Sequence, residues 1–172
     1  FDQVFESYLN LEGVDAWIEK LTPKLESPDA KQSTGILLGQ IYARQFRSTD
    51  AIEVLQSVSQ GEQNSAPYNR LLGTLFYREG DNEKGIELLT AALGGLSDLE
   101  ERSQVSRMLG NLFLREGNTD KAVEVWQQVA AQSPTDLFAQ LELGDIYQEN
   151  RLWDEAITCL LYTSPSPRDL YR

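Results

Sequence analysis

The side chains of this chain that could do chemistry are carboxylates, arginines and a single thiol. The sequence contains 27 Asp and Glu, 15 Lys and Arg, one Cys and no His. Without histidine, and with Cys159 as the one thiol, the common nucleophile–base dyads and Cys/His metal sites cannot be assembled. We therefore predict that the chain is not an enzyme and binds neither a metal ion nor a cofactor.

The carboxylates and glycines also lack the spacing of known ligand-binding loops. Most acidic residues stand in polar stretches such as 79–81 and 98–101, where solvation and favourable charge at helix N-termini account for them. Asp81 and Glu83 do not continue into a calcium loop, and no glycine-rich stretch has phosphate-loop spacing. The remaining expected mode of action is recognition of a partner by the protein surface.

The charge and composition exclude several classes of partner. The net charge of −12 disfavours binding to nucleic acid or to an anionic membrane, because most of the surface would repel phosphates. No stretch approaches the roughly 20 apolar residues that a membrane-spanning helix needs. The composition, 41% hydrophobic and 24% charged, is that of a soluble globular protein. This favours a cytoplasmic location, with a periplasmic one left open, and it indicates no organism or pathway.

One pattern occurs four times along the chain, at spacings of 34, 37 and 34 residues. Each copy begins with Leu-Gly and has an aromatic residue three positions after the glycine. The four glycines are Gly39, Gly73, Gly110 and Gly144. A small residue follows nine positions after the aromatic, at Ala51, Gly85, Ala122 and Ala156. A large apolar residue stands four positions further on in the first three copies, at Leu55, Leu89 and Trp126, and Leu160 occupies this position in the last.

The elements that carry this pattern are predicted to be paired helices. Apolar residues recur at helical spacing on both sides of the short polar stretch 78–84, which contains a glycine suited to a helix end. A glycine inside a helix costs about 1 kcal/mol relative to alanine. Its recurrence in phase therefore predicts close approach of the second helix, with the small residues Ala51, Ala122 and Ala156 facing the glycines.

The pattern resembles the tetratricopeptide repeat family, whose repeat reads Leu-Gly-x2-aromatic, then Ala-x3-large, then Pro, as at Pro134 here. The resemblance implies an all-α fold, a right-handed α-solenoid of antiparallel helix-turn-helix repeats. We expect repeats at 32–65, 66–102 with a three-residue insertion, and 103–136. A degenerate hairpin is expected at 1–31, with helices over 1–10 and 14–25. A truncated repeat is expected at 137–158, with a first helix over 137–149 and a second that begins at Trp153 and could run on to about Tyr162. The chain departs from the family in lacking its Trp near the start of the first helix, and in Gly85, where Ala is usual.

Both ends of the chain indicate a fragment. The sequence opens at Phe1 rather than at an initiator Met. Residues 159–169 read CLLYTSPSPRD, which matches the translation of a transposase-type sequencing adapter. We therefore expect residues 159–172 to be a non-native tail, and Cys159 with it. The alternative is a natural Ser/Pro-rich tail.

The family resemblance also implies a binding surface, because first helices of such repeats line a concave groove. Positions carried over by this resemblance predict a peptide site made of Gln40, Arg70, Thr74, Tyr77, Arg107 and Asn111. Arg70 and Arg107 would hold a carboxylate bidentately, from an acidic segment or a free C-terminus of a partner protein or peptide. The family's chaperone-binding clamp is not reproduced, because Ile36 stands where its first Lys would fall.

Other interpretations of the arginines and of the array stay open. Arg70 and Arg107 could instead pair with acidic neighbours such as Glu142 or Asp145. Arg44, Arg78 and Arg115, two residues after each aromatic, are explained by favourable cation placement at helix C-termini. The expected function is a protein–protein interaction scaffold that binds a partner's peptide segment or helix. The alternatives are the non-catalytic array of a larger enzyme or signalling protein, and a self-assembly module.

Overall fold

The computed structural model describes residues 13–26, 31–59, 64–132 and 137–163, and these are helical apart from short connections. The chain divides into two compact units, 1–96 and 97–172, called the first and second unit below. The first unit contains α2 (Val14–Leu21), the 3₁₀ helix η1 (Thr22–Glu26), α3 (Lys31–Arg44), α4 (Ser48–Ser57), α5 (Ala66–Glu79) and α6 (Asn82–Gly95). The second contains α7 (Leu99–Arg115), α8 (Thr119–Ala130), α9 (Leu137–Glu149) and α10 (Trp153–Thr163).

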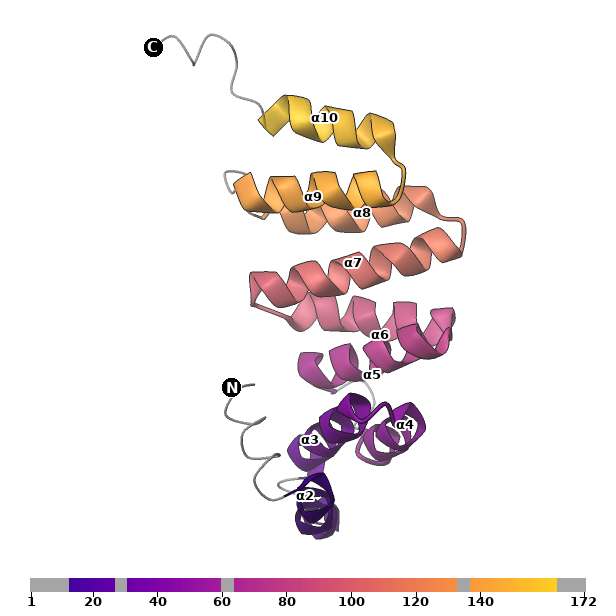
Figure 1. Ribbon diagram of the computed structural model, residues 1–172, viewed down its shortest axis with the longest axis vertical. Helices are drawn as coiled ribbons and strands as arrows, with labels where there is room; N and C mark the ends of the chain where they lie inside the picture. Colours follow the sequence, from indigo (N-terminus) through magenta and orange to yellow (C-terminus); the bar gives the residue numbers. More distant parts are fainter. Residues whose placement is uncertain (1–12, 27–30, 60–63, 133–136, 164–172) are drawn as a thin grey trace. The chain divides into compact units, whose positions relative to one another are not determined.

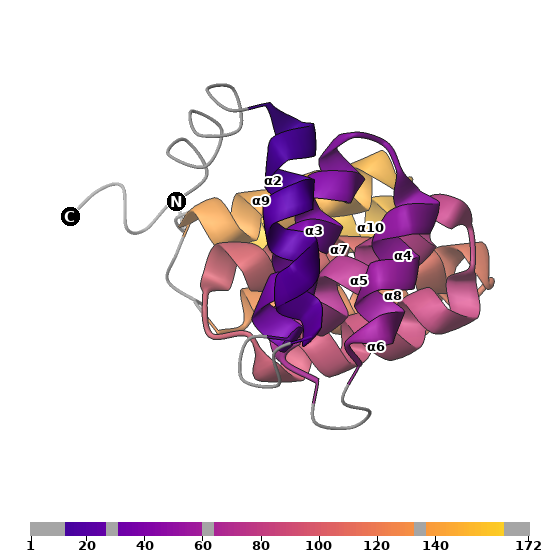
Figure 2. The same ribbon diagram turned by 90° about the horizontal axis from the view of Figure 1, so that it is seen from below.

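The helices pair along the chain as antiparallel hairpins, which confirms the predicted all-α helix-turn-helix repeats. In the first unit α3 pairs with α4 and α5 with α6, and α3 also contacts α5 (Figures 1 and 2). In the second unit α7 pairs with α8 and α9 with α10. No strand occurs among the residues that the structure describes.

Each of the four hairpins turns through the same backbone motif. In the turn that follows each first helix, a single residue has a positive φ, in the left-handed region that favours glycine. These residues are Phe46 (59°), Gly80 (80°), Gly117 (75°) and Arg151 (60°). The next residue donates its backbone N–H to the carbonyl of the repeat's aromatic residue. These bonds are Arg47 to Tyr42 (2.9 Å), Asp81 to Phe76 (3.0 Å), Asn118 to Phe113 (2.8 Å) and Leu152 to Tyr147 (2.8 Å). The bond closes the first helix in the manner of a Schellman motif.

Side chains then start the second helices. The carboxylate of Asp81 accepts the backbone N–H of Lys84 (3.2 Å) at the start of α6, and the amide oxygen of Asn118 accepts that of Lys121 (3.2 Å) at the start of α8. The Lys84 ammonium also donates to Asp81 (2.9 Å), and these bonds lower the pKa of that carboxyl. The polar residues that connect the two helices of a hairpin thus end the first helix and directly begin the second.

The in-phase glycines lie where the two helices of a hairpin pack closely, as predicted, but the facing residue differs from the expectation. A Cβ added at Gly39 would lie 2.9 Å from Cγ of Leu55, and one added at Gly73 would lie 2.9 Å from Cγ of Leu89. At Gly110 it would overlap the indole of Trp126. The nearest atoms therefore belong to the large apolar residue 16 positions on, and not to the small one, because the longer side chain reaches back over the glycine.

In the last hairpin, the residues at the corresponding positions are Gly144 and Ala156. No described side chain comes within 4 Å of a Cβ built at Gly144. Its counterpart 16 positions on is Leu160, whose side chain lies outside the described residues. The small residue Ala156 is buried, as are Ala51 and Ala122 in their hairpins.

The segment before the first full repeat is only partly helical in the expected way. One helix was predicted over 14–25, whereas α2 ends at Leu21 and η1 follows. Pro23 accounts for the change, since it has no N–H to donate to the carbonyl four residues earlier. The other predicted helix of this hairpin, over 1–10, lies outside the described residues. At the other end, α9 has the predicted bounds, and α10 continues to Thr163, one residue beyond the expected stop.

Candidate functional site

A surface pocket of about 360 Å³ lies in the first unit, between the C-terminal half of α3, the α3–α4 turn and α5. Its lining is Gln40, Ala43, Arg44, Phe46, Arg70, Leu71, Thr74 and Arg78. The two first helices of adjacent repeats thus each contribute one wall. We call it the arginine pocket, after Arg44, Arg70 and Arg78.

The structure brings three of the six predicted site residues together here. Gln40, Arg70 and Thr74 all line the arginine pocket. Tyr77 is half-buried on α5 and is not part of this lining. Sequence reasoning missed Arg44, Phe46 and Arg78 as members of the same site.

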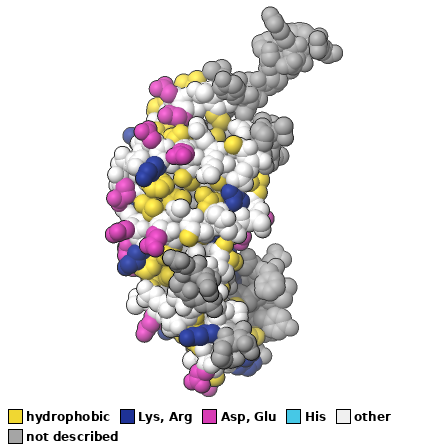
Figure 3. Space-filling view, turned by 180° about the vertical axis from the view of Figure 1, so that it is seen from behind, with side chains coloured by type: hydrophobic (Ala, Val, Ile, Leu, Met, Phe, Trp, Pro, Cys, Tyr) yellow, Lys and Arg dark blue, Asp and Glu magenta, His cyan; other side chains and the backbone are white. Residues whose placement is uncertain are grey.

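The electrostatics of the arginine pocket suit an anion. Three guanidinium groups line it, and its described lining includes no carboxylate, although the chain as a whole has a net charge of −12. Guanidinium groups present paired N–H donors that match a carboxylate, and such charge-assisted hydrogen bonds are stronger than neutral ones. Local positive charge beside apolar surface is not confined to one spot: Figure 3 shows Lys and Arg side chains next to hydrophobic ones on the face drawn there.

The positions of Arg44 and Arg78 explain why they were missed. Both stand in the last turn of a first helix, as Arg115 does, so favourable interaction with the helix C-terminus accounted for them. That placement is confirmed, but it also brings the two side chains to the end of the helices where the pocket opens. The hydroxyl of Thr74 donates to the carbonyl of Arg70 (2.7 Å), which directs its lone pairs away from the helix backbone.

The two remaining predicted site residues, Arg107 and Asn111, lie on α7 in the second unit, and both are half-buried. Nη1 of Arg107 lies 3.2 Å from Oε2 of Glu149, and both side chains are at least 36% exposed. Arg107 thus contacts an acidic residue, as the alternative interpretation expected, but the residue is Glu149, which that interpretation did not name. An exposed pair of this kind contributes little to stability and exchanges readily. The arrangement of Arg70 beside Arg107 stays a prediction.

The second unit has a pocket whose lining partly occupies the same repeat positions but contains two carboxylates and one arginine. A cavity of about 390 Å³ is lined by Asp145, Gln148, Glu149, Arg151 and Trp153. The first four correspond in the repeat to Gln40, Ala43, Arg44 and Phe46 of the arginine pocket. An acidic residue thus replaces Arg44 at the helix end, and an arginine replaces Phe46 at the turn. Of these two pockets, the one in the first unit has the lining that suits an anion.

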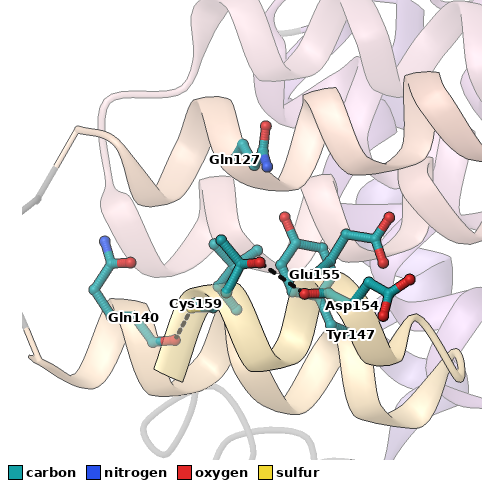
Figure 4. A pocket seen from close by; sticks show the side chains of 8 residues that line it. Gln127, Gln140, Tyr147, Asp154, Glu155 and Cys159 are labelled. Carbon is teal, nitrogen blue, oxygen red and sulfur yellow. Dashed lines mark hydrogen bonds between the residues drawn. The ribbon is translucent and has the colours of Figure 1, made fainter. Parts of the chain in front are cut away.

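A further pocket of the second unit, about 460 Å³, holds the chain's thiol (Figure 4). Gln127 comes from α8, Gln140 and Tyr147 from α9, and Cys159 from α10. The Cys159 thiol donates to the carbonyl of Gln140 (3.4 Å). Burial raises the pKa of Cys159 and raises the pKa of Tyr147 to about 12. Both groups stay protonated at neutral pH, which is the opposite of an activated nucleophile.

Neither a candidate metal site nor a membrane-spanning helix is found among the described residues. Among them, no group of three or more His, Cys, Asp or Glu side chains is placed to hold a metal ion. No helix in this part of the chain has the length and apolar character needed to cross a membrane.

Comparisons with known proteins agree with the repeat architecture. Residues 107–166 match the family model described as tetratricopeptide repeat. The fold is similar to that of MamA, with a TM-score of 0.69 and 23% identity over 91% of this chain and 90% of that one. It is similar to the nearly identical TPR-like repeats of a putative kinesin light chain from Podosopora anserina, with a TM-score of 0.70 and 18% identity over 94% and 90%.

A third solved structure is relevant because of what it is said to bind. YrrB, described as a TPR protein with an unusual peptide-binding site, matches with a TM-score of 0.61 and 16% identity over 91% of this chain and 82% of that one. Identities this low establish a shared fold and not a shared partner. No curated protein sequence matches the chain.

Proposed function

We propose that this chain is a tetratricopeptide repeat protein whose arginine pocket binds an acidic segment of a partner protein. Proteins of this fold are generally protein-interaction modules and generally non-catalytic scaffolds. The observation that carries the proposal is the convergence of Arg44, Arg70 and Arg78 on one cavity of an otherwise acidic protein.

The lining offers a complete set of contacts for an extended acidic peptide. The guanidinium groups would each take a carboxylate oxygen, and a partner C-terminus would serve as well as an acidic side chain. The Gln40 amide and Thr74 hydroxyl would hydrogen-bond the peptide's polar groups, and Leu71 offers apolar surface. Since both walls are helices, the backbone that carries these side chains is ordered before binding, which lowers the entropic cost of association.

The proposal predicts a specific loss of binding. The probe is a fluorescein-labelled eight-residue peptide with two adjacent glutamates and a free C-terminal carboxylate, titrated by fluorescence anisotropy. In the double variant Arg70→Ala/Arg78→Ala, we expect the affinity to fall at least about tenfold, since each hydrogen bond to a charged group contributes about 1.5–3 kcal/mol. The melting temperature should change little, because Arg78 is exposed and Arg70, although half-buried, does not belong to the apolar core.

The matched control is Arg115→Ala/Lys121→Ala, which removes the same charge from exposed positions of α7 and α8. Equal weakening in the two double variants would show that the peptide responds only to net charge and would refute the pocket. Should the Arg70 change disturb folding, Arg70→Gln keeps a side chain of similar reach without the charge. Arg107→Ala is the corresponding test of the predicted contribution from Arg107 and Asn111.

A further inference from the structure

We infer that Phe46 is a recognition residue of the arginine pocket, which selects partner segments with an apolar side chain next to the acidic one. The inference rests on the proposed function of that pocket and adds the chemistry of the residue beside the carboxylate. It is drawn from three independent properties of Phe46: its backbone conformation, its exposure and its place in the lining.

The backbone conformation of Phe46 is unfavourable for its residue type. Its φ of 59° lies in the left-handed region, where a Cβ crowds the following carbonyl. Gly80 and Gly117 occupy the same turn position in two other repeats and meet the geometry without that strain. The turn itself therefore gives no reason for a phenylalanine. Among the described residues other than glycine, Phe46 and Arg151 have a positive φ, and such strain points to function where packing does not account for the residue.

The side chain of Phe46 makes no core packing that would offset the backbone strain. It is 92% exposed, the largest value among the exposed large hydrophobic residues of the described chain. The aromatic residues of the repeat pattern behave differently, with Phe76 and Tyr147 buried in the core. At the equivalent turn of the last hairpin stands Arg151, whose charge is readily solvated. Neither core packing nor solubility accounts for an aromatic ring at position 46.

The ring is held at the mouth of a charged cavity. Phe46 lines the arginine pocket together with Arg44, Arg70 and Arg78. The turn beneath it is fixed, because Arg47 donates its backbone N–H to Tyr42 (2.9 Å), while its side chain pairs with Asp50 (2.6 Å) and lies over the Tyr42 ring (4.6 Å). A ring with two rotatable bonds on a fixed turn loses little entropy when a ligand covers it.

These properties together define the chemistry of the ligand. The three guanidinium groups would bind a carboxylate. The adjacent exposed ring of Phe46 would pack against an apolar group of the ligand, which would remove the ring from water. An acidic residue followed by a leucine or another large apolar residue offers both within one short segment. The corresponding pocket of the second unit combines these features differently, with Glu149 in place of Arg44, Arg151 in place of Phe46, and the exposed ring of Trp153 beside two carboxylates.

Two peptides and two variants test this inference. The peptides are eight residues long and differ only in the residue after a glutamate pair, which is leucine in one and serine in the other. The wild-type chain should bind the leucine peptide about fivefold more tightly, as expected for partial burial of one apolar side chain. Phe46→Gly should bind both peptides equally, at the level of the serine peptide, and should have a higher melting temperature.

The matched control is Arg151→Gly, which relieves the same backbone conformation in the last hairpin and should preserve the fivefold preference. Binding of both peptides with equal affinity by the wild type and by Phe46→Gly would overturn the inference and leave the proposed function intact. Failure of both peptides to bind the wild type would overturn the proposed function itself. A lower melting temperature for Phe46→Gly would show that the ring is structural. A dimer in light scattering that Phe46→Gly abolishes would show that a second copy covers the ring, and this would also overturn the inference.

Discussion

Gly110→Ala is expected to destabilise the second unit by about 3 kcal/mol, near the upper end of what overpacking of a core costs. The added methyl group would overlap the indole of Trp126, with its Cζ2 only 2.5 Å away. Trp126 is 1% exposed and its ring packs edge-on against Tyr147, with ring centroids 6.2 Å apart, so it has little room to move. Urea unfolding followed by circular dichroism measures the loss.

Two variants make this expectation sharp. Gly94→Ala is the control, because the methyl group at this exposed helical position meets nothing within 4 Å, and alanine should stabilise by about 0.5 kcal/mol there. Trp126→Leu introduces the residue found at the equivalent positions 55 and 89. In that background Gly110→Ala should cost at least about 1 kcal/mol less, since neighbouring residues couple. Additive effects would mean that the two residues do not touch.

Leu109→Ala is expected to cost about 2–5 kcal/mol, as truncation of a buried leucine does. Leu109 is 1% exposed and stands at the first position of the Leu-Gly-aromatic pattern. Leu141 provides the comparison, since it also lies on a first helix but is 43% exposed. Leu141→Ala should change the free energy of unfolding by no more than about 0.5 kcal/mol. Similar values for the two leucines would show that the repeat register assigned to α7 and α9 is wrong.

The repeat register could be predicted from the sequence because each structural role recurs at a fixed spacing. The Leu-Gly-aromatic pattern placed α9 at its observed bounds, since the same apolar face had already appeared three times. The facing partner of Gly110 could not be predicted in this way. Ala122 and Trp126 both recur in the pattern on the second helix, so the pattern alone does not say which of them lies against the glycine. The reach and direction of the indole decide this.

The candidate site was predictable only in part, for related reasons. Gln40, Arg70 and Thr74 were found because the family resemblance assigns them to groove positions. Arg107 could not be matched with Glu149, 42 residues later, because pairing depends on side-chain direction. The sequence does contain a feature that could have pointed to Phe46. This residue aligns with Gly80 and Gly117 at the turn, where a residue other than glycine is strained.

The most direct test of the arginine pocket is an NMR titration of the isotope-labelled chain with the glutamate-pair peptide ending in a free carboxylate. We expect saturable amide shifts confined to the C-terminal half of α3, the α3–α4 turn and α5, including Gln40, Phe46 and Thr74. Arg70→Ala/Arg78→Ala should abolish these shifts at the same peptide concentration. Shifts centred on α8 to α10, or none at millimolar peptide, would contradict the assignment of the first unit as the binding site.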